Sequence, residues 1–389
     1  MGRLLLACAT TKGAPIDQDL IDATGPLIER LPLAAERHGI AMASAVALAH
    51  CDMPDVVRLQ LAGRLRVGVT RQALLSLELS RLGAALDRAS ITWVAVKGPT
   101  VAERFYPRAD LRSYVDLDLL VARAEYGDAL AVLQKAGGSF VERDWDDVLH
   151  LFKGELNLKF PSMVVADVHW SLLYDQVLRD EFRWDDRALL GRRQLAALGG
   201  GLRVPVLDDI DCFVHLAVHA CLAGGQRLCW MRDLQLVGAA LAESWQVVLD
   251  RARTWKIDLV VGVMMERVRR VVGAEPWPRD IEEALVSGRG WDLAVRGFDG
   301  IRQPQRWLGG SLSGHLLVAS TRETTSASLR TLRRRGADEL RVLRTEADHP
   351  WRRVLPEKVN RRVATVPRPV SPERPDFLRA YLEAVAASE

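Results

Sequence analysis

The chain has 389 residues, of which 49% are hydrophobic and 26% charged, and its formal net charge is +3. These values are typical of a globular protein and exclude a disordered chain, a collagen and a low-complexity scaffold. The near-neutral charge also argues against binding to bulk nucleic acid, which usually needs a concentrated basic surface. Only seven of the 53 basic residues are lysines, so a lysine is a rare choice in this chain.

The cysteine pattern and the apolar runs bear on where the protein works. The five cysteines include no Cys-x-x-Cys pair, so we expect reduced thiols. The apolar run near the start is too short for the core of a signal peptide. No segment approaches the roughly 18 apolar residues that cross a bilayer. We therefore expect a cytoplasmic protein without membrane association.

Residues 1–90 are predicted to form an N-terminal helical segment. Apolar residues recur at helical spacing over Ile16–His50 and again over Val56–Arg88. We expect one apolar stripe of the second helix to face the core, namely Leu59, Leu61, Leu65, Leu74, Leu75, Leu79, Leu82 and Leu86.

Residues 91–205 are predicted to form an α/β core, because β-branched and aromatic runs alternate with amphipathic ones. The predicted strands are Ile91–Val96, Val115–Val121, Phe140–Arg143, Val148–Lys159 and Met163–Trp170. The predicted helices are Pro99–Phe105 and Glu125–Ala136, with a loop over Pro107–Arg112 between the first helix and the second strand.

Residues 206–300 are predicted to form a second helical region, and residues 301–389 an arginine-rich tail that is helical or extended. The predicted helices are Asp208–Leu222, Leu228–Leu241, Trp245–Trp255 and Leu259–Val272, followed by short ones at Ile281–Leu285 and Trp291–Phe298. Four prolines favour an extended chain over Pro367–Pro375. We interpret Arg333–Arg335 as a solvated face rather than a nucleic-acid site, because no aromatic residues are interleaved with it.

Three aspartates on predicted strands form the candidate catalytic and metal site. Asp116 and Asp118 are two residues apart, so a strand places them on one face. Asp167 lies in a later apolar strand, and the three carboxylates converge if the two strands are neighbours. Such a cluster repels itself unless a cation is bound. Carboxylate oxygens suit Mg²⁺ or Mn²⁺, and two ions about 3.5–4 Å apart would stabilise the entering and the leaving oxygen.

Four further residues are candidates for binding the phosphates or another part of the substrate. Lys97 and Gly98 lie where a strand ends and a helix begins, a junction at which backbone N–H groups can meet phosphate oxygens. Arg112 precedes the acid pair and is suited to bidentate phosphate contact. His169 lies on the same strand face as Asp167 and could touch the substrate.

Two other features favour structural roles over functional ones. His215 and His219 are four residues apart on a predicted helix and could share a zinc ion, but packing or hydrogen bonding is the stronger interpretation. Asp233 could line an acceptor pocket, although a structural role is again favoured.

The segment WVAVKGPTVAERFYPRADLRSYVDLDLLV resembles the signature of an uncharacterised nucleotidyltransferase family within the DNA-polymerase-β-like superfamily. Later segments that are similar to this family are Val165–Trp170, Phe213–Ala220 and Leu228–Asp233. The resemblance implies an α/β (α+β) core with a mixed sheet, flanked by helical segments. One departure is that the wider superfamily has Gly-Ser where this chain has Lys97-Gly98, so the phosphate grip must differ.

The resemblance also implies an enzyme that transfers a nucleoside monophosphate from an NTP such as ATP to an acceptor, with loss of pyrophosphate. Asp116, Asp118 and Asp167 would hold magnesium, and Asp167 could also help to deprotonate the acceptor. The acceptor stays open between a small molecule, a sugar, a peptide and an RNA end. The alternative is a non-catalytic nucleotide- or peptide-binding partner in a biosynthetic cluster or a toxin–antitoxin pair.

Overall fold

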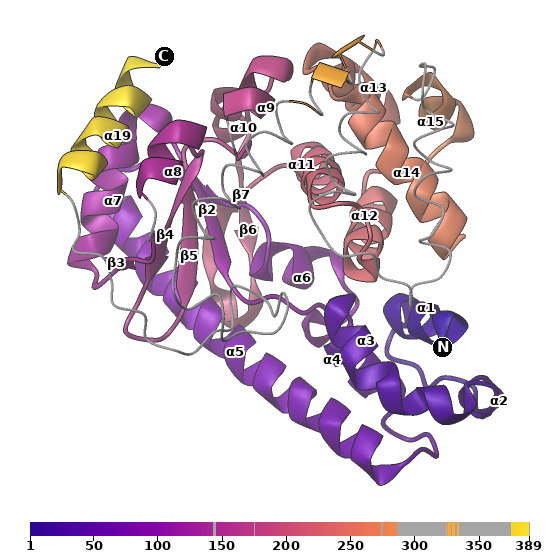
Figure 1. Cartoon of the computed structure of the whole chain (residues 1–389). Helices are drawn as coiled ribbons and strands as arrows, with labels where there is room; N and C mark the ends of the chain where they lie inside the picture. The colour runs from indigo at the N-terminus through magenta and orange to yellow at the C-terminus, as the bar shows by residue number, and fades with distance from the viewer. Residues whose placement is uncertain are drawn as a thin grey trace.

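A computed structural model describes residues 1–142, 145–174, 176–273, 275–285 and 375–388, together with six single positions between 324 and 333. The helix expected at Trp291–Phe298 lies outside these residues, as does the tail up to residue 374 apart from those six positions. Figure 1 shows a sheet with helices on both faces, the N-terminal helices on one side and the C-terminal helix α19 on the other. The helix expected over Ile16–His50 is divided into short pieces, because Pro26, Pro32 and the left-handed Gly39 (φ +68°) interrupt it. These are α2 (Gln18–Asp22), η1 (Gly25–Arg30), α3 (Leu31–Arg37) and α4 (Ala41–Ala47), and the helix α1 (Gly2–Thr10) precedes them.

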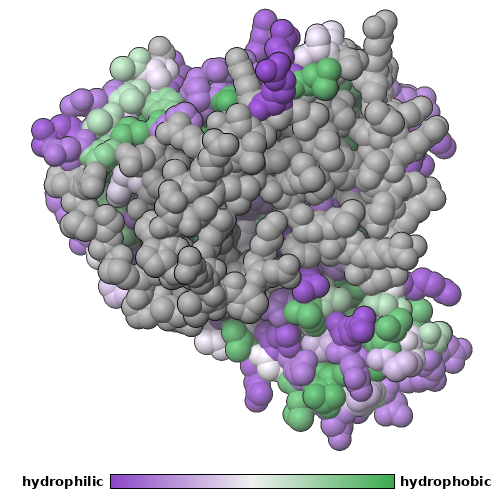
Figure 2. All heavy atoms as spheres, in the orientation of Figure 1, coloured by the Kyte–Doolittle hydropathy of each residue, from purple (hydrophilic) through white to green (hydrophobic). Residues whose placement is uncertain are grey.

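The helix α5 (Asp55–Arg88) confirms the long second helix, but its predicted apolar stripe is only partly correct. Leu75, Leu79, Leu82 and Leu86 are fully buried against the sheet, whereas Leu59 is 70% exposed. Leu74 is 43% exposed. Leu59 lies where the helix extends well past the sheet and only shorter N-terminal helices cover it (Figure 1). Leu74 adjoins the buried Leu75 but points about 100° away from it around the helix. Figure 2 shows apolar and polar side chains mixed over this lower part of the molecule.

Seven strands form one mixed sheet in the order β3-β4-β5-β2-β1-β7-β6, which confirms the predicted mixed α/β class. The pairs β2–β5 and β1–β7 are parallel and the other four pairs are antiparallel. The strands are β1 (Trp93–Ala95), β2 (Leu117–Val121), β3 (Ser139–Phe140), β4 (Glu155–Lys159), β5 (Val165–His169), β6 (Gln194–Ala197) and β7 (Arg203–Val206). The last two are not predicted by the sequence, since both are short and β6 is largely exposed.

The strand predicted over Val148–Lys159 is wrong in its first half. Residues 145–151 form the helix α8 (Trp145–Leu151), and β4 begins only at Glu155. The break between them has a positive φ at Phe152 (+44°), and at Gly154 a side chain would meet the carbonyl oxygens of Ser171 and Leu173. The other elements of this region are α6 (Pro99–Phe105), η2 (Ala109–Leu111), η3 (Arg123–Glu125), α7 (Tyr126–Lys135), α9 (Gln176–Glu181), α10 (Asp186–Gly191) and η4 (Gly199–Gly201).

The C-terminal helices follow the predicted ranges closely. They are α11 (Asp209–Leu222), α12 (Leu228–Ala240), α13 (Trp245–Thr254), α14 (Asp258–Val272) and α15 (Arg279–Leu285), and the chain ends with α19 (Pro375–Ala387). Among the described helices, including the 34-residue α5, none combines the length and the apolar character needed to span a bilayer.

Two apolar cores lie on opposite faces of the sheet. Leu117 and Leu119 of β2 point into one core, which α5, α7 and α19 cover. Leu120 points into the other core, which contains side chains of α11, α12 and α14 as well as of α1, α3 and α4. Because side chains alternate along a strand, Asp118 shares the face of Leu120. The acid therefore lies between the sheet and the helices α11 and α12.

Candidate active site

A row of polar residues crosses three adjacent strands on this face of the sheet. We call these residues, together with Asp116, the acid row. Asp118 of β2 is level with Asp167 of β5, and Asp167 is level with Asn157 of β4. The side-chain amide of Asn157 donates a hydrogen bond to Oδ1 of Asp167. The two acids are deeply buried, with 3% of Asp118 and 4% of Asp167 exposed. The parallel pairing of β2 and β5 is therefore what brings the third predicted acid beside the pair.

The ammonium group of Lys97 lies among these carboxylates. Its Nζ is 2.9 Å from Oδ1 of Asp118, and the lysine side chain is only 17% exposed. Burial alone would lower the pKa of Lys97, but the negative charges of Asp118, Asp116 and Asp167 raise it above its usual value. Burial works against the charged form of Asp118 as well, yet Lys97 and His169 hold the pKa of that carboxyl far below its ordinary range. Asp118 is thus an ionised carboxylate beside a cation that the chain itself supplies.

His169 connects the acid row to a residue that the sequence does not single out. Its Nε2 is 3.3 Å from Oδ1 of Asp118, and its Nδ1 is 3.0 Å from Oε2 of Glu155 on the neighbouring strand β4. Burial lowers the pKa of His169, but Glu155 and Asp118 raise it to about 10. The imidazole is therefore a second cation at the cluster. The signal for Glu155 and Asn157 is the alternation Glu-Leu-Asn-Leu-Lys, which places both on one strand face.

Arg112 does not point its hydrogen-bond donors at the acid row. Its Nε and Nη2 each lie 2.8 Å from an oxygen of Asp233 on α12, and its Nη1 donates to the carbonyl oxygen of Gly98 at 3.2 Å. The hydroxyl of Tyr106 also donates to Asp233, at 2.7 Å. Burial disfavours the charged guanidinium, but Asp233 more than compensates and raises the pKa of Arg112. Arg112 thus ties α12 to the Lys97–Gly98 turn, and Asp233 has a structural contact.

Gly98 adopts a left-handed backbone (φ +69°, ψ −120°) that other residues rarely take. A Cβ atom at this position would lie 3.3 Å from the carbonyl oxygen of Asp116. The glycine therefore lets the turn after β1 pack closely against the residue that begins the acid pair. Asp116 itself precedes β2 and is half-buried.

The helix α11 presents a histidine that the sequence analysis assigns to packing or hydrogen bonding. His215 is 4% exposed, and its Nε2 has no hydrogen-bond partner within the described part of the chain. Burial, followed by the charge of Lys97, lowers the pKa of His215 to about 3, so the ring is neutral. The rings of Trp184 and His219 lie 6.4 and 6.1 Å from it, centroid to centroid.

The donor set of the acid row suits a hard cation, because it consists of carboxylate oxygens with an amide beside them. The position is already occupied by a cation, the ammonium group of Lys97, which all three aspartates stabilise. Across the residues that the structure describes, no three His, Cys, Asp or Glu side chains are gathered closely enough to surround an ion. An added metal ion would thus require some of these side chains to turn.

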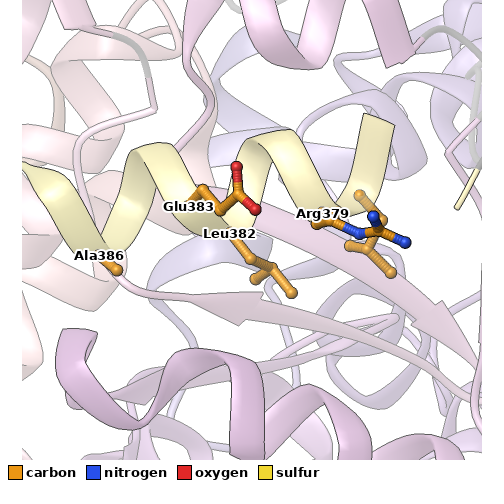
Figure 3. Close-up of a pocket in the computed structure, with 5 residues that line it drawn as sticks. Arg379, Leu382, Glu383 and Ala386 are labelled. Atoms are coloured by element: carbon orange, nitrogen blue, oxygen red, sulfur yellow. The ribbon is translucent and has the colours of Figure 1, made fainter. Parts of the chain in front are cut away.

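The hollow drawn in Figure 3 lies elsewhere. It is lined by five residues of one helix, α19, and contains no member of the acid row: Leu378, Arg379, Leu382, Glu383 and Ala386. Three of these five residues are apolar, and the other two are Arg379 and Glu383.

The protein is thus a mixed α/β protein in which two aspartates lie side by side on neighbouring parallel strands. A comparison with protein families shows that the chain belongs to the family described as uncharacterised nucleotidyltransferase, whose model matches residues 27–273. No curated protein matches the chain. The family confirms the resemblance seen in the sequence. The matched range includes the whole sheet, β1 to β7, and the helices α11 to α14. The acid row and the helices that pack over it therefore lie within the part of the chain that matches the family.

Proposed function

We propose that the protein transfers a nucleoside monophosphate from an NTP to an acceptor hydroxyl or phosphate, and that its core is of the polymerase-β-like type. The observation that carries this proposal is the convergence of Asp116, Asp118 and Asp167 around one buried cation. Family membership supports transferase activity and an NTP as substrate. The division into residues 1–90, 91–205, 206–300 and 301–389 stays a prediction.

In the proposed reaction the acceptor oxygen forms a bond to the α-phosphorus while the bond from that phosphorus to the bridging oxygen breaks. The acceptor proton goes to a carboxylate, for which we propose Asp167, and pyrophosphate leaves. A divalent ion held by Asp116, Asp118 and Asp167 would, when bound, polarise the phosphate and neutralise developing charge. Lys97 and His169 place positive charge against Asp118, and they lower the pKa of that carboxyl although burial would raise it.

In this proposal the substrate lies between the acid row and the helix α11, which carries His215. Because His215 is neutral and its Nε2 lacks a partner in the described residues, it can accept or donate one hydrogen bond to a bound substrate. The neighbouring Trp184 ring offers an apolar surface. Neither feature selects one acceptor, so a sugar, a small molecule, a peptide and an RNA end all remain candidates.

The proposal is tested with α-³²P-labelled NTPs, each incubated with the protein, Mg²⁺ or Mn²⁺ and a cell extract. We expect transfer of label to one acceptor class by wild type, and a loss of at least about 100-fold with Asp118→Asn. The matched control is Asp128→Asn, which removes an exposed carboxylate from α7 on the other side of the sheet. Absence of label with all four NTPs and both metals would favour the non-catalytic alternative.

A further inference from the structure

The long helix α5 carries a second row of apolar and small residues, on a side that faces solvent. These residues recur three or four positions apart, and at 3.6 residues per turn they fall within about 80° of the helix circumference. The leucines that α5 buries against the sheet, such as Leu75 and Leu79, point in another direction. We call this row the outer stripe, and its members are Val56, Leu59, Gly63, Val67, Thr70, Leu74 and Leu77.

The outer stripe is open to solvent over its whole length, which is about 30 Å at 1.5 Å per residue. The exposed fractions of its five large side chains are 53% for Val56, 70% for Leu59, 58% for Val67, 43% for Leu74 and 69% for Leu77. Single exposed leucines are common on protein surfaces, whereas a continuous apolar row marks a surface that binds a partner.

The charge beside the outer stripe is positive. The helical repeat places Arg66 on one side of the stripe and Arg71 on the other, and both side chains are exposed. Between Asp55 and Glu78 the helix contains no acidic residue. An apolar row with basic residues along both sides favours a partner that is apolar inside and anionic at its surface.

We propose that the outer stripe of α5 lies on an anionic lipid surface, with its leucines and valines among the acyl chains and Arg66 and Arg71 at the phosphate groups. Amphipathic helices with basic borders lie in the plane of a membrane interface in this way. The helix α5 extends past the sheet to the outer edge of the molecule, where a flat surface can reach it (Figure 1). Such contact is peripheral and does not depend on the proposed function. It differs from the expectation, drawn from the sequence, of no membrane association.

Two other occupants fit the outer stripe less well. A second copy of α5 would bring its basic borders against those of the first, and like charges oppose association. A helix of an acidic protein would match the charge, but helices pack by interlocking side chains. Gly63 and Thr70 leave low places on the stripe, and a Cβ atom at Gly63 would meet nothing within 4 Å. Fluid acyl chains fill such places without a matching shape.

The test is co-sedimentation of the full chain with lipid vesicles. One set contains phosphatidylcholine alone, and the other contains about 30% phosphatidylglycerol in addition. We expect binding to the anionic vesicles that weakens as salt is added, and little binding to the neutral ones. Leu77→Asp should lower the partition coefficient at least about 10-fold, because a carboxylate replaces an inserted leucine. Arg66→Gln should lower it about 5-fold.

The matched control is Leu195→Asp. It makes the same change at another exposed leucine, 57% exposed, which lies on the edge strand β6. This variant should bind the anionic vesicles as wild type does. Both leucines are exposed, so each variant is expected to fold, and an unchanged circular dichroism spectrum checks this.

No binding of wild type to the anionic vesicles would overturn the proposal, and so would equal loss of binding in Leu77→Asp and Leu195→Asp. Equal binding to both kinds of vesicle would contradict it as well, because the arginines would then have no role. Sedimentation equilibrium provides the last check. A dimer of wild type that Leu77→Asp dissociates would show that a second copy covers the outer stripe instead. None of these outcomes bears on the transfer of label proposed for the acid row.

Discussion

Arg112 and Asp233 form a buried ion pair with two hydrogen bonds, Nε to Oδ1 and Nη2 to Oδ2, each 2.8 Å long. The pair joins the turn after β1 to the helix α12, because the third contact of Arg112 is the carbonyl oxygen of Gly98. Only 8% of the arginine side chain and 1% of the aspartate side chain are exposed. The ion pair thereby links the end of the interior strand β1 to the helix α12, which packs over this face of the sheet.

Removing one partner of this pair should destabilise the protein strongly. A buried charge left without its partner costs about 3–5 kcal/mol, so we expect Asp233→Asn to lower the free energy of unfolding by that amount in urea titrations. The control is Arg58→Ala, which breaks an exposed pair with Asp55 at 3.7 Å and should cost less than about 1 kcal/mol. Equal effects of the two variants would contradict a structural role for the buried pair.

The contact between α5 and β1 predicts opposite effects for two glycine substitutions in one helix. A Cβ atom at Gly83 would lie 2.7 Å from Cζ2 of Trp93, whose ring is held by a 2.8 Å hydrogen bond to Asp87. We expect Gly83→Ala to destabilise by about 1–3 kcal/mol. At Gly63 a Cβ meets nothing within 4 Å, so Gly63→Ala should stabilise by about 0.5–1 kcal/mol. Thermal unfolding of both variants checks the pair, and the same sign for both would show that Trp93 does not limit the space.

The protonation of His169 predicts a pH dependence of stability. Its pKa is raised from 6.5 to about 10 in the folded protein, since Glu155 and Asp118 outweigh the effect of burial. A raised pKa means that the folded state holds a proton which the unfolded state has lost above pH 6.5. The contribution is complete below about pH 6.5 and is lost as the pH rises towards 10.

We therefore expect the urea midpoint of wild type to fall between pH 6.5 and 10. His169→Gln should show a smaller fall, because it has no proton to lose. A matched control is His50→Gln, which removes an exposed histidine beyond α4. Identical pH profiles for wild type and His169→Gln would contradict the ion pairs at this residue.

The hydroxyl group of Tyr381 is one of the contacts that attach the C-terminal helix α19 to the rest of the protein. The indole N–H of Trp170 donates to Oη of Tyr381 at 2.7 Å, and this hydroxyl donates in turn to the carbonyl oxygen of Lys153. We expect Tyr381→Phe to lower the free energy of unfolding by about 0.5–1.5 kcal/mol, as measured in urea. Ser388→Ala removes a hydroxyl near the end of the same helix and should have a smaller effect, because Ser388 is exposed. The opposite ranking would show that α19 contributes little to the core.

The sequence alone determined the residue types and local elements that make the site possible. Alternation places Asp116 and Asp118 on one face, and the apolar runs around Asp167 predict a buried strand. The same periodicity located α5, α11, α12 and α14 to within a few residues. These features are local, since they depend on which neighbours a residue has along the chain. The signature around Lys97 and Asp118 also sufficed to identify the family, which the match over residues 27–273 confirms.

Only the tertiary structure decided which groups meet. The register of β2, β5 and β4 brings Asp118 level with Asp167 and Asn157. The same pairing supplies Glu155 as a partner for His169. Arg112, which the sequence predicts to bind phosphate, forms an ion pair with Asp233 from a helix more than a hundred residues later. Two of the eight leucines of the predicted α5 stripe, Leu59 and Leu74, are exposed. Strand register and ion pairing across long separations depend on packing of the whole chain, which a local pattern does not contain.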